Sequence, residues 1–212
     1  MFFEVTKRII DIAGGLVLLI VFSPIILITA IAIKVSSSGP VFADTPMRIG
    51  KDGKLFYLYK FRSMVVNAHN LLRKDPRFRK LYTEYKKSSF KLREDPRVTN
   101  VGKLIRRHSI DEIPQLINVL RGEMSIVGPR PYYPDELTQQ TAKYPRTKKL
   151  LKEVLSVRPG ITGFWQVSGR SEVNFDKRIE MDAYYARKRS IWLDILILLK
   201  TPWAMIFGKG AV

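Results

Sequence analysis

The chain has 212 residues, 46% of them apolar, which is enough for one domain with a buried core, and it lacks cysteine, which excludes a disulfide framework and a thiolate metal site. Its net charge of +18 is concentrated at positions 48–107, which hold 18 Lys and Arg against 5 Asp and Glu. This surplus favours phosphate-rich partners such as anionic lipid, nucleotides or nucleic acid, with a basic surface that only faces water as the alternative.

The first expected element is a long apolar helix. Ile12–Ile33 are 22 uncharged residues, which as a helix would be roughly 33 Å long and sufficient to cross a hydrocarbon layer. A signal peptide is an alternative, but its apolar core is only about 7 to 15 residues long. Ser23-Pro24 lies at the middle of the segment, where proline removes a backbone hydrogen bond and kinks a helix.

Basic residues on both sides of this helix bear on its topology. Lys7 and Arg8 precede it, and Lys34, Arg48 and Lys51 follow it. Because basic flanks tend to stay in the cytoplasm, a broken helix that enters and leaves on the cytoplasmic face satisfies both flanks, whereas a straight span satisfies one. We therefore favour a re-entrant helix, with an ordinary kinked span as the alternative.

A short antiparallel hairpin is expected next. Ser36–Pro40 ends the helix, because serine, glycine and proline punctuate regular structure. Val41-Phe42 and Leu55–Phe61 have the composition of strands and flank a turn at Gly50–Gly53.

Lys60 and Arg62 alternate with aromatic residues at the end of this hairpin. The mixture suits a phosphate, or alternatively the interface of a lipid layer, and both residues are candidates for binding phosphate.

Residues 65–93 are very basic, and their apolar residues recur near helical spacing, which predicts one or two surface helices. These helices would lie on lipid headgroups or, almost equally, in water.

The central segment contains the pair Asp111-Glu112 ahead of a short amphipathic helix that Gly122 ends. Ser109 and Glu112 have the spacing of a capping box, whereas a helix that begins at Asp111 suits Pro114 better. With either start of the helix, the carboxylates of Asp111 and Glu112 lie at its positive, N-terminal end. A purely structural role in starting the helix is therefore a serious alternative to catalysis.

The remaining chain is expected to alternate helices and loops. Residues 135–155 predict a pair of polar helices, 175–187 a further helix, and 192–207 an apolar helix at a membrane interface or in the core. Arg158–Gly163 and Gln166–Arg170 are loops rich in small residues, with Arg158, Gln166 and Arg170 as donors for a phosphate or a nucleobase.

The chemistry open to Asp111 follows from its basic surroundings. A carboxylate near arginines and a helix N-terminus stays ionised at neutral pH, which makes it a poor general acid but a usable nucleophile or metal ligand. Attack on a phosphate also needs cations that neutralise the phosphate oxygens. Mg²⁺ on Asp111, together with Lys60, Arg106 and Arg130, would meet that need and lead to an aspartyl-phosphate intermediate.

Several motifs share one resemblance. They are Ser23-Pro24, Tyr59–Met64, Asp95–Thr99, Gly102–Arg106, Ser109–Ser125, Gly128–Pro131, Arg158–Gly163, Gln166–Arg170 and residues 192–201. Over nearly its whole length the chain is similar to the bacterial sugar transferases, the small monotopic polyprenyl-phosphate glycosyl-1-phosphate transferases.

The resemblance implies transfer of a sugar-1-phosphate from a UDP-sugar to undecaprenyl phosphate, with release of UMP, as the first membrane step of exopolysaccharide, capsule or O-antigen assembly. It implies that Asp111 is the nucleophile, that Glu112 lies beside it, and that Mg²⁺ assists. It also implicates Lys60, Arg106, Arg130 and Asp182 in handling phosphate, nucleotide or metal. The enzyme would lie on the cytoplasmic face of the bacterial inner membrane, in contact with phospholipids.

The expected fold is α+β and mainly α: a re-entrant helix over residues 1–36, then a catalytic part over 37–212 with the small hairpin and interfacial helices. The insertion at residues 65–93 and the residues Trp165–Arg170 resemble those of family members that transfer galactose or glucose. The extra N-terminal membrane spans that some of those members carry are not expected here. Relatives usually have glutamine about where Pro46 stands, which puts any role of that side chain in doubt. A homodimer is left open.

The alternative to an enzyme is a basic protein that binds a membrane surface or a nucleic acid. Because the order of basic and aromatic residues matches no nucleic-acid motif, no nucleic-acid partner is expected.

Overall fold

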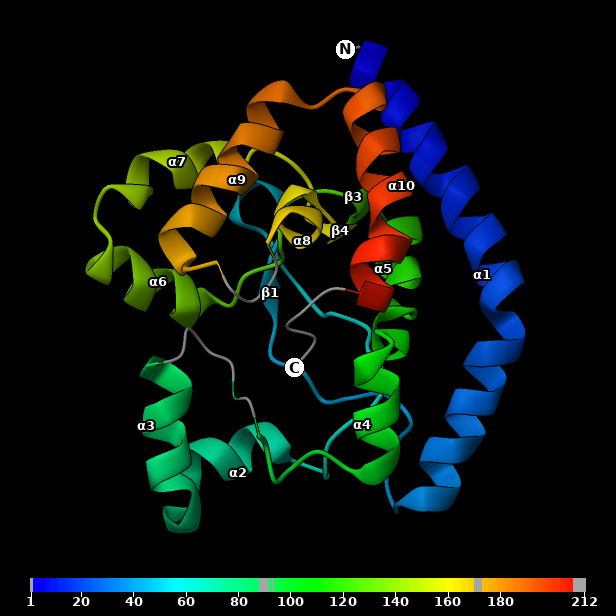
Figure 1. Cartoon of the computed structure of the whole chain (residues 1–212), viewed down its shortest axis with the longest axis vertical. Helices are drawn as coiled ribbons and strands as arrows, with labels where there is room; N and C mark the ends of the chain where they lie inside the picture. Colours follow the sequence, from blue (N-terminus) through cyan, green and yellow to red (C-terminus); the bar gives the residue numbers. More distant parts are fainter. Residues whose placement is uncertain (1, 88–91, 93, 170–172, 208–212) are drawn as a thin grey trace.

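The structure is a computed structural model that describes residues 2–87, 92, 94–169 and 173–207, and the arrangement is mainly helical (Figure 1). Its α-helices are α1 (Phe2–Ser36), α2 (Ala68–Lys74), α3 (Arg79–Lys87), α4 (Asn100–Arg107), α5 (Gln115–Arg121), α6 (Pro134–Lys143), α7 (Thr147–Val154), α8 (Phe164–Ser168), α9 (Phe175–Lys188) and α10 (Ile191–Phe207). Short 3-10 turns occur at Lys51–Gly53, Pro76–Phe78 and Ile110–Glu112.

Two small sheets complete the part of the fold that the structure describes. In the first, β1 (Arg48–Ile49) pairs antiparallel with β2 (Leu55–Phe56), and an isolated antiparallel bridge joins Phe42 to Phe61 farther along. A hairpin around the predicted turn is thus confirmed, but its first strand is Arg48–Ile49, whereas in the predicted strand Val41-Phe42 only Phe42 pairs, through the isolated bridge. In the second, β3 (Ser125–Val127) pairs parallel with β4 (Gly160–Thr162), which the sequence did not predict.

The parallel pair brings Gly128 and Gly160, which belong to two of the motifs, into very close contact. Gly128 N donates to Thr162 O at 2.9 Å, and Gly160 N donates to Pro129 O at 2.8 Å. A Cβ on Gly160 would lie 2.0 Å from Gly128 N, so only glycine allows the two backbones to approach this closely. The segment that carries Arg130 is therefore fixed against the core.

The helix α1 is one continuous, curved helix along the side of the molecule (Figure 1). It ends at Ser36, where a break was predicted. The break expected at Ser23-Pro24 is not present, because α1 remains helical through Pro24. The Ser23 hydroxyl donates to Ile20 O at 2.7 Å. Among the described residues, α1 is the helix that is long and apolar enough to cross a membrane. Only 11% of an 18-residue apolar stretch of α1 is buried.

The N-terminal part of α1 is held to α5 and β3 by polar contacts. The Arg8 guanidinium donates to Val119 O at 2.6 Å and to Leu120 O at 2.9 Å, which satisfies carbonyls at the end of α5. Asp11 is buried and accepts from Ser125 Oγ and Ile126 N, both at 3.0 Å. These contacts fix α1 in one position along the folded part.

The C-terminal part of α1 packs on α4 through apolar contacts. Ile33 forms a buried cluster with Phe61 and Ile105, and Ile26 and Ala30 pack against it. Both halves of α1 therefore contact the same folded part of the chain.

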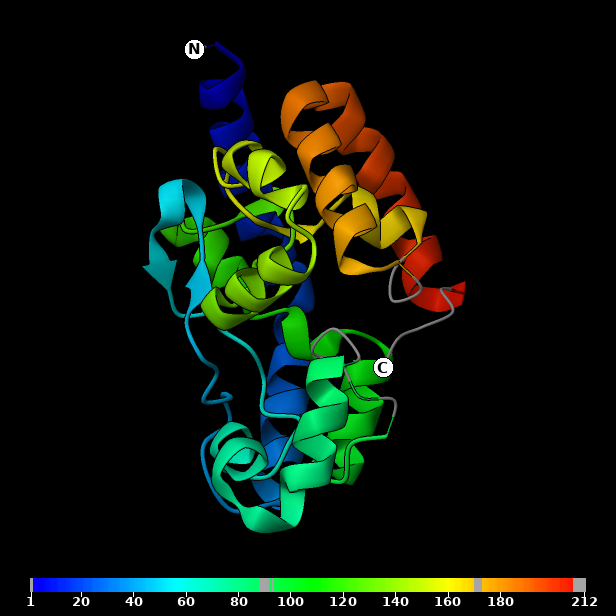
Figure 2. The same ribbon diagram turned by 90° about the vertical axis from the view of Figure 1, so that its left-hand side faces the viewer.

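The other predicted helices are present. Two basic helices, α2 and α3, form over residues 65–93 and enclose a small core of Leu72, Tyr85 and Leu92. The expected polar pair is α6 and α7, the expected helix over 175–187 is α9, and the apolar tail is α10. In Figure 2, α9 and α10 both lie above and to the right of α2 and α3, and α8 packs against both of them.

Candidate active site

A cavity of about 720 Å³ lies at the centre of the described structure, within the size range of ligand pockets. Its charged side is lined by Lys60, Arg106, Asp111, Glu112 and Arg130. These residues come from the segment after β2, from α4, from the turn before α5 and from the segment after β3. The tertiary structure thus brings together the pair and the three cations that the sequence proposed as one site.

The centre of the site is one ammonium between two carboxylates. Lys60 Nζ lies 2.9 Å from Asp111 Oδ2 and 3.2 Å from Glu112 Oε1. The side chain of Asp111 is 3% exposed, whereas that of Glu112 is 39% exposed. Asp111 therefore meets a ligand only through the cavity, while Glu112 stands nearer to its opening.

The backbone around this pair departs from the predicted capping box. Ser109 has a left-handed φ of 54° and its side chain caps nothing, so that prediction is wrong. Ile110–Glu112 instead form a 3-10 turn, in which Glu112 N donates to Ser109 O at 3.1 Å, and Pro114 precedes the first residue of α5. The proline fits there because a residue at the start of a helix needs no backbone N–H donor. Gly122, with φ of 80°, ends α5 as predicted.

The protonation of the two carboxylates differs with their surroundings. Burial raises the pKa of Asp111, and the attraction of Lys60 opposes that rise only in part. Burial also acts to raise the pKa of Glu112, but Lys60 and the more distant Arg130 and Arg48 outweigh it, so that the pKa is lowered. Asp111 was expected simply to stay ionised; in the structure its ionised form depends on Lys60.

Arg130 is positioned by a buried carboxylate behind it. Asp182 is fully buried and accepts from Tyr132 Oη at 2.8 Å and from Arg130 N at 3.3 Å. Burial raises the pKa of Asp182 to about 7. The guanidinium of Arg130 lies 5.7 Å from the ring centre of Trp165, and its Nε has no hydrogen-bond partner within the described residues. Arg130 thus retains donor capacity beside the cavity.

The remaining predicted site residues have mixed outcomes. Gln166 lines the cavity, and its buried Oε1 has no partner among the residues with described positions. Arg62 also lines the cavity, but its guanidinium donates hydrogen bonds to Ser37 and to Ser38 O, which follow α1. Asp182 does not line it. Arg158 donates to Gly122 O at 2.8 Å instead of facing it. Arg170 lies outside the described residues.

Sequence reasoning missed three residues at the far end of the charged side. Arg48, His69 and Tyr133 line the cavity, and the guanidinium of Arg48 stacks 3.2 Å from the ring centre of Tyr133. Burial, followed by repulsion from Arg73, lowers the pKa of His69 to about 4, so this ring is neutral. A basic residue just before a hairpin turn gives no periodic signal of burial, which is why Arg48 was read only as a flanking charge.

Pro46 also lines the cavity. Its ring offers no donor, so the doubt about a polar role at this position stands.

The donor set near Asp111 is suited to a hard cation that takes few protein ligands. No group of three or more His, Asp or Glu side chains that could hold a metal occurs in the part of the chain that the structure describes. Mg²⁺ is usually held by one or two carboxylates, with phosphate oxygens and water completing its shell. The adjacent carboxylates of Asp111 and Glu112 fit that pattern.

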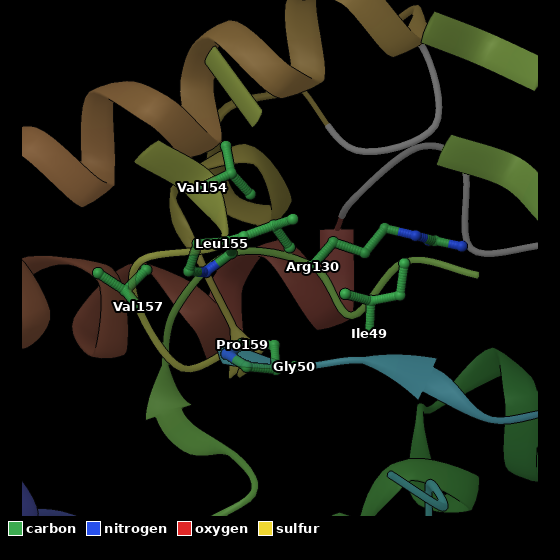
Figure 3. A pocket seen from close by; sticks show the side chains of 8 residues that line it. Ile49, Gly50, Arg130, Val154, Leu155, Val157 and Pro159 are labelled. Carbon is green, nitrogen blue, oxygen red and sulfur yellow. The ribbon is translucent and has the colours of Figure 1, made fainter. Parts of the chain in front are cut away.

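A second, very small pocket also borders the Arg130 segment (Figure 3). It is lined by Ile49, Gly50, Val154, Val157 and Pro159, among others, and the side chain of Arg130 points away from the two valines in Figure 3. Its volume of about 10 Å³ is close to the lower limit for a single water molecule. This pocket does not hold a substrate.

Comparison with known proteins places these residues in a family. The sequence model described as "Bacterial sugar transferase" matches residues 2–208. An undecaprenyl-phosphate galactose phosphotransferase of Salmonella typhimurium is 42% identical over 209 residues, which cover 97% of this chain and 41% of that protein. The exopolysaccharide production protein ExoY of Sinorhizobium fredii is 37% identical, with 98% of this chain and 88% of that protein covered.

An undecaprenyl-phosphate glucose phosphotransferase of Komagataeibacter xylinus is 39% identical over 97% of this chain and 36% of its own length. The chain thus spans about two fifths of two of these relatives and nearly all of the third. The family model matches almost every residue, including the motifs whose side chains line the cavity. The chain belongs to the bacterial sugar transferase family.

Proposed function

We propose that this protein is a phosphoglycosyl transferase that moves a sugar-1-phosphate from a UDP-sugar to undecaprenyl phosphate. The observation that carries the proposal is the buried carboxylate of Asp111, paired with Lys60 at 2.9 Å, in a cavity that Arg106 and Arg130 also line. An anionic nucleophile beside several cations matches the needs of attack on a phosphate. The names of the Salmonella typhimurium and Komagataeibacter xylinus relatives supply the acceptor and the class of reaction.

In the first step, a carboxylate oxygen of Asp111 attacks the phosphorus that carries the sugar. A bond from Asp111 to phosphorus forms, the bond from that phosphorus to the bridging oxygen breaks, and UMP leaves with the electron pair. Lys60 keeps Asp111 ionised before attack. Because Lys60, Arg106 and Arg130 are positively charged, they stabilise the negative charge that develops on the phosphate oxygens.

In the second step, an oxygen of undecaprenyl phosphate attacks the aspartyl phosphorus. The bond to Asp111 breaks, so the carboxylate is regenerated and the product is a lipid-linked diphosphate sugar. The same cations serve both steps, because each passes through a phosphorus centre bonded to Asp111.

We further propose that Asp111 holds Mg²⁺, with Glu112 as a second carboxylate beside it. When bound, the ion supplies positive charge that offsets repulsion between Asp111 and the phosphate oxygens. Lys60 then remains the residue that balances the charge of the buried carboxylate between turnovers.

The protein is proposed to lie on the cytoplasmic face of the bacterial inner membrane. Support comes from α1, whose two halves both pack on the same folded part through Asp11 and Ile33. A helix held this way has both ends near one face of the membrane, and its exposed apolar side faces lipid. A straight crossing would instead carry one end away from the folded part.

These two relatives are named for different sugars, galactose for one and glucose for the other. The test is therefore a screen of UDP-galactose, UDP-glucose and UDP-N-acetylgalactosamine with the purified protein, undecaprenyl phosphate and Mg²⁺. We expect UMP release with at least one donor, dependent on both Mg²⁺ and the acceptor for repeated turnover. Release of UMP from none of them, or tight salt-dependent binding of RNA instead, would overturn the proposal.

A further inference from the structure

The cavity that contains Asp111 has a second, apolar side. Leu18, Phe22 and Ile25 of α1 line it, and their spacing of four and three positions places them on one face of that helix. From α10, Leu198 and Pro202 line the same cavity. Two helices at opposite ends of the sequence thus supply apolar walls to one space.

The floor between these walls is the parallel sheet. Ile126 of β3 and Ile161 of β4 line the cavity, and both α1 and α10 pack on β3. A Cβ on Gly14 would lie 2.9 Å from Ile126 Cδ1, which shows how closely α1 approaches this strand. Close packing of α1 on β3 therefore bounds this apolar side of the cavity, which is called the channel below.

The outer surfaces of the two helices are also apolar. On α10, Leu199 is 75% exposed and Trp203 is 68% exposed, and on α1 Ile20 is 73% and Ile28 67% exposed. An apolar surface of this extent favours hydrocarbon over water. The channel therefore lies between two surfaces that would be in contact with lipid chains.

The two substrates of the proposed reaction differ in what they need from this channel. A nucleotide sugar carries phosphates, hydroxyl groups and a polar base, and its burial against leucine and isoleucine would leave polar groups without partners. A polyprenyl phosphate has one anionic group at the end of a long hydrocarbon chain. Its phosphate suits the cations near Asp111, and its chain suits the apolar walls.

We propose that the isoprenoid chain of the acceptor lies between α1 and α10, on the floor formed by Ile126 and Ile161. Its phosphate reaches Lys60 and Arg106 beside Asp111, while the rest of the chain extends toward the lipid. This inference rests on the proposed function. It adds the residues that bind the lipid part of the acceptor, which separates them from the residues that bind the donor.

The test uses a bulky substitution in the channel with a matched control on the same helix. Leu198→Trp fills the channel, whereas Leu199→Trp changes the neighbouring residue, which is 75% exposed and does not line the cavity. Ile25→Trp and Ile28→Trp form the corresponding pair on α1, because Ile28 does not line it either. The full chain is used in vesicles, with the UDP-sugar that gives the greatest UMP release.

Two half-reactions are then measured separately. Formation of the aspartyl adduct from the donor alone is followed by intact mass, and transfer to the acceptor by radiolabelled lipid product. For Leu198→Trp and Ile25→Trp we expect adduct formation within about twofold of wild type. Transfer to undecaprenyl phosphate should fall about tenfold or more, as expected if about two methylene groups lose their contacts. With an acceptor of only two isoprene units the loss should be much smaller.

The outcomes separate this inference from the proposed function. If the wild type forms no adduct and releases no UMP, the proposed function itself fails. If the wild type is active and Leu198→Trp transfers to undecaprenyl phosphate as fast as Leu199→Trp does, the channel assignment is wrong. Equal losses of adduct formation and transfer in Leu198→Trp would assign the channel to the donor, and would also overturn the inference.

A photoreactive polyprenyl phosphate gives a measurement that needs no variant. We expect crosslinks on peptides that contain Leu18–Ile25 and Leu198–Ala204, and competition by undecaprenyl phosphate. Labels confined to the exposed face around Trp192, or displaced equally well by phosphatidylglycerol, would indicate general lipid contact and contradict a specific channel.

Discussion

The ammonium of Lys60 lies 2.9 Å from the carboxylate of Asp111, although the two residues belong to different motifs. The backbone sets this distance, because Phe61 N donates to Asp111 O at 2.9 Å and so aligns the two segments. Removing Asp111 from water raises its pKa, and the adjacent cation limits that rise. The proposed nucleophile is thus poised by a contact that only the fold creates.

Asp111→Asn should abolish transfer, because an amide is not a nucleophile toward phosphorus at neutral pH. We expect UMP release to fall by roughly 10³-fold or more, as when a covalent nucleophile is removed. The aspartyl adduct should be absent by intact mass. Asp52→Asn, in the exposed hairpin turn, is the control and should retain full activity. Turnover of Asp111→Asn near the wild-type rate would rule out covalent catalysis by this residue.

Lys60→Met should move the acid limb of the pH–rate profile to higher pH. The carboxylate attacks in its ionised form, so the rate falls as pH drops through the pKa of Asp111. Without the ammonium of Lys60, its attraction no longer opposes the effect of burial, and the pKa of Asp111 rises further. The profile of UMP release between pH 5 and 9 measures this effect.

Lys60→Arg should restore part of the profile, and Lys54→Met, an exposed lysine in the hairpin, should leave it unchanged. An acid limb that stays in place in Lys60→Met would show that Lys60 does not control the ionisation of Asp111.

Asp182→Asn should remove one pH dependence of the stability. The pKa of Asp182 is about 7 in the folded protein against an ordinary 3.8, so the folded state binds the proton more tightly than the unfolded chain. The stability that this carboxyl contributes is therefore present at low pH and is lost as pH rises from about 4 through 7. Between pH 5 and 7 the loss is roughly 2 to 3 kcal/mol, which Asp182→Asn should not show.

The measurement is the midpoint of thermal unfolding at pH 5, 6, 7 and 8. The midpoint of the variant minus that of the wild type should increase by roughly 5 °C from pH 5 to pH 8. Asp176→Asn on the same helix is the matched control. Burial acts to raise the pKa of Asp176, but Arg146 and backbone donors outweigh it and the pKa is lowered, so its contribution is lost as pH falls. A constant difference between Asp182→Asn and wild type across this range would contradict the assigned ionisation.

Gly102→Ala should destabilise the segment that carries Lys60. A Cβ on Gly102 would lie 1.9 Å from Ser63 O, a backbone atom that cannot move without shifting its neighbours. We expect a loss of roughly 1 to 3 kcal/mol in the free energy of unfolding, together with reduced activity. Gly14→Ala is the control, since its new methyl meets only the end of the Ile126 side chain. Equal stability of both variants would show that α4 does not set the position of Ser63.

Membrane topology can be tested with single cysteines, because the chain contains none. Cysteines placed at Val5 and at Val35, both exposed, should be protected from impermeant thiol reagents added outside the cell. Protection of both sites is expected if α1 lies with its two ends on the cytoplasmic face. Labelling of either site from outside would show that α1 crosses the membrane.

Local sequence patterns were sufficient for elements whose stability is mostly local. The length and apolarity of Ile12–Ile33 predicted α1, and helical spacing predicted the helices that became α6, α7, α9 and α10. Glycine at position 122 ended α5 as expected, because φ of 80° is a conformation that glycine adopts readily.

Long-range contacts decided what these patterns could not. The parallel pair joins β3, for which no strand was predicted, to β4 within the Arg158–Gly163 run, which was expected to be a loop. Three-residue strands have no periodic signal that could reveal them. Burial of Arg48 and Asp182, and the use of Arg158 on Gly122 O, depend on partners far away in the chain.

The sequence by itself determined which residues are proposed to carry the chemistry: Asp111-Glu112 and the cations around them, within motifs that resemble one family. The tertiary structure decided how they are arranged, by placing Lys60 against Asp111 and by bringing α1 and α10 to one cavity. The physical reason is that charge and hydrophobicity are properties of residues, whereas desolvation, pairing and enclosure are properties of neighbours in space.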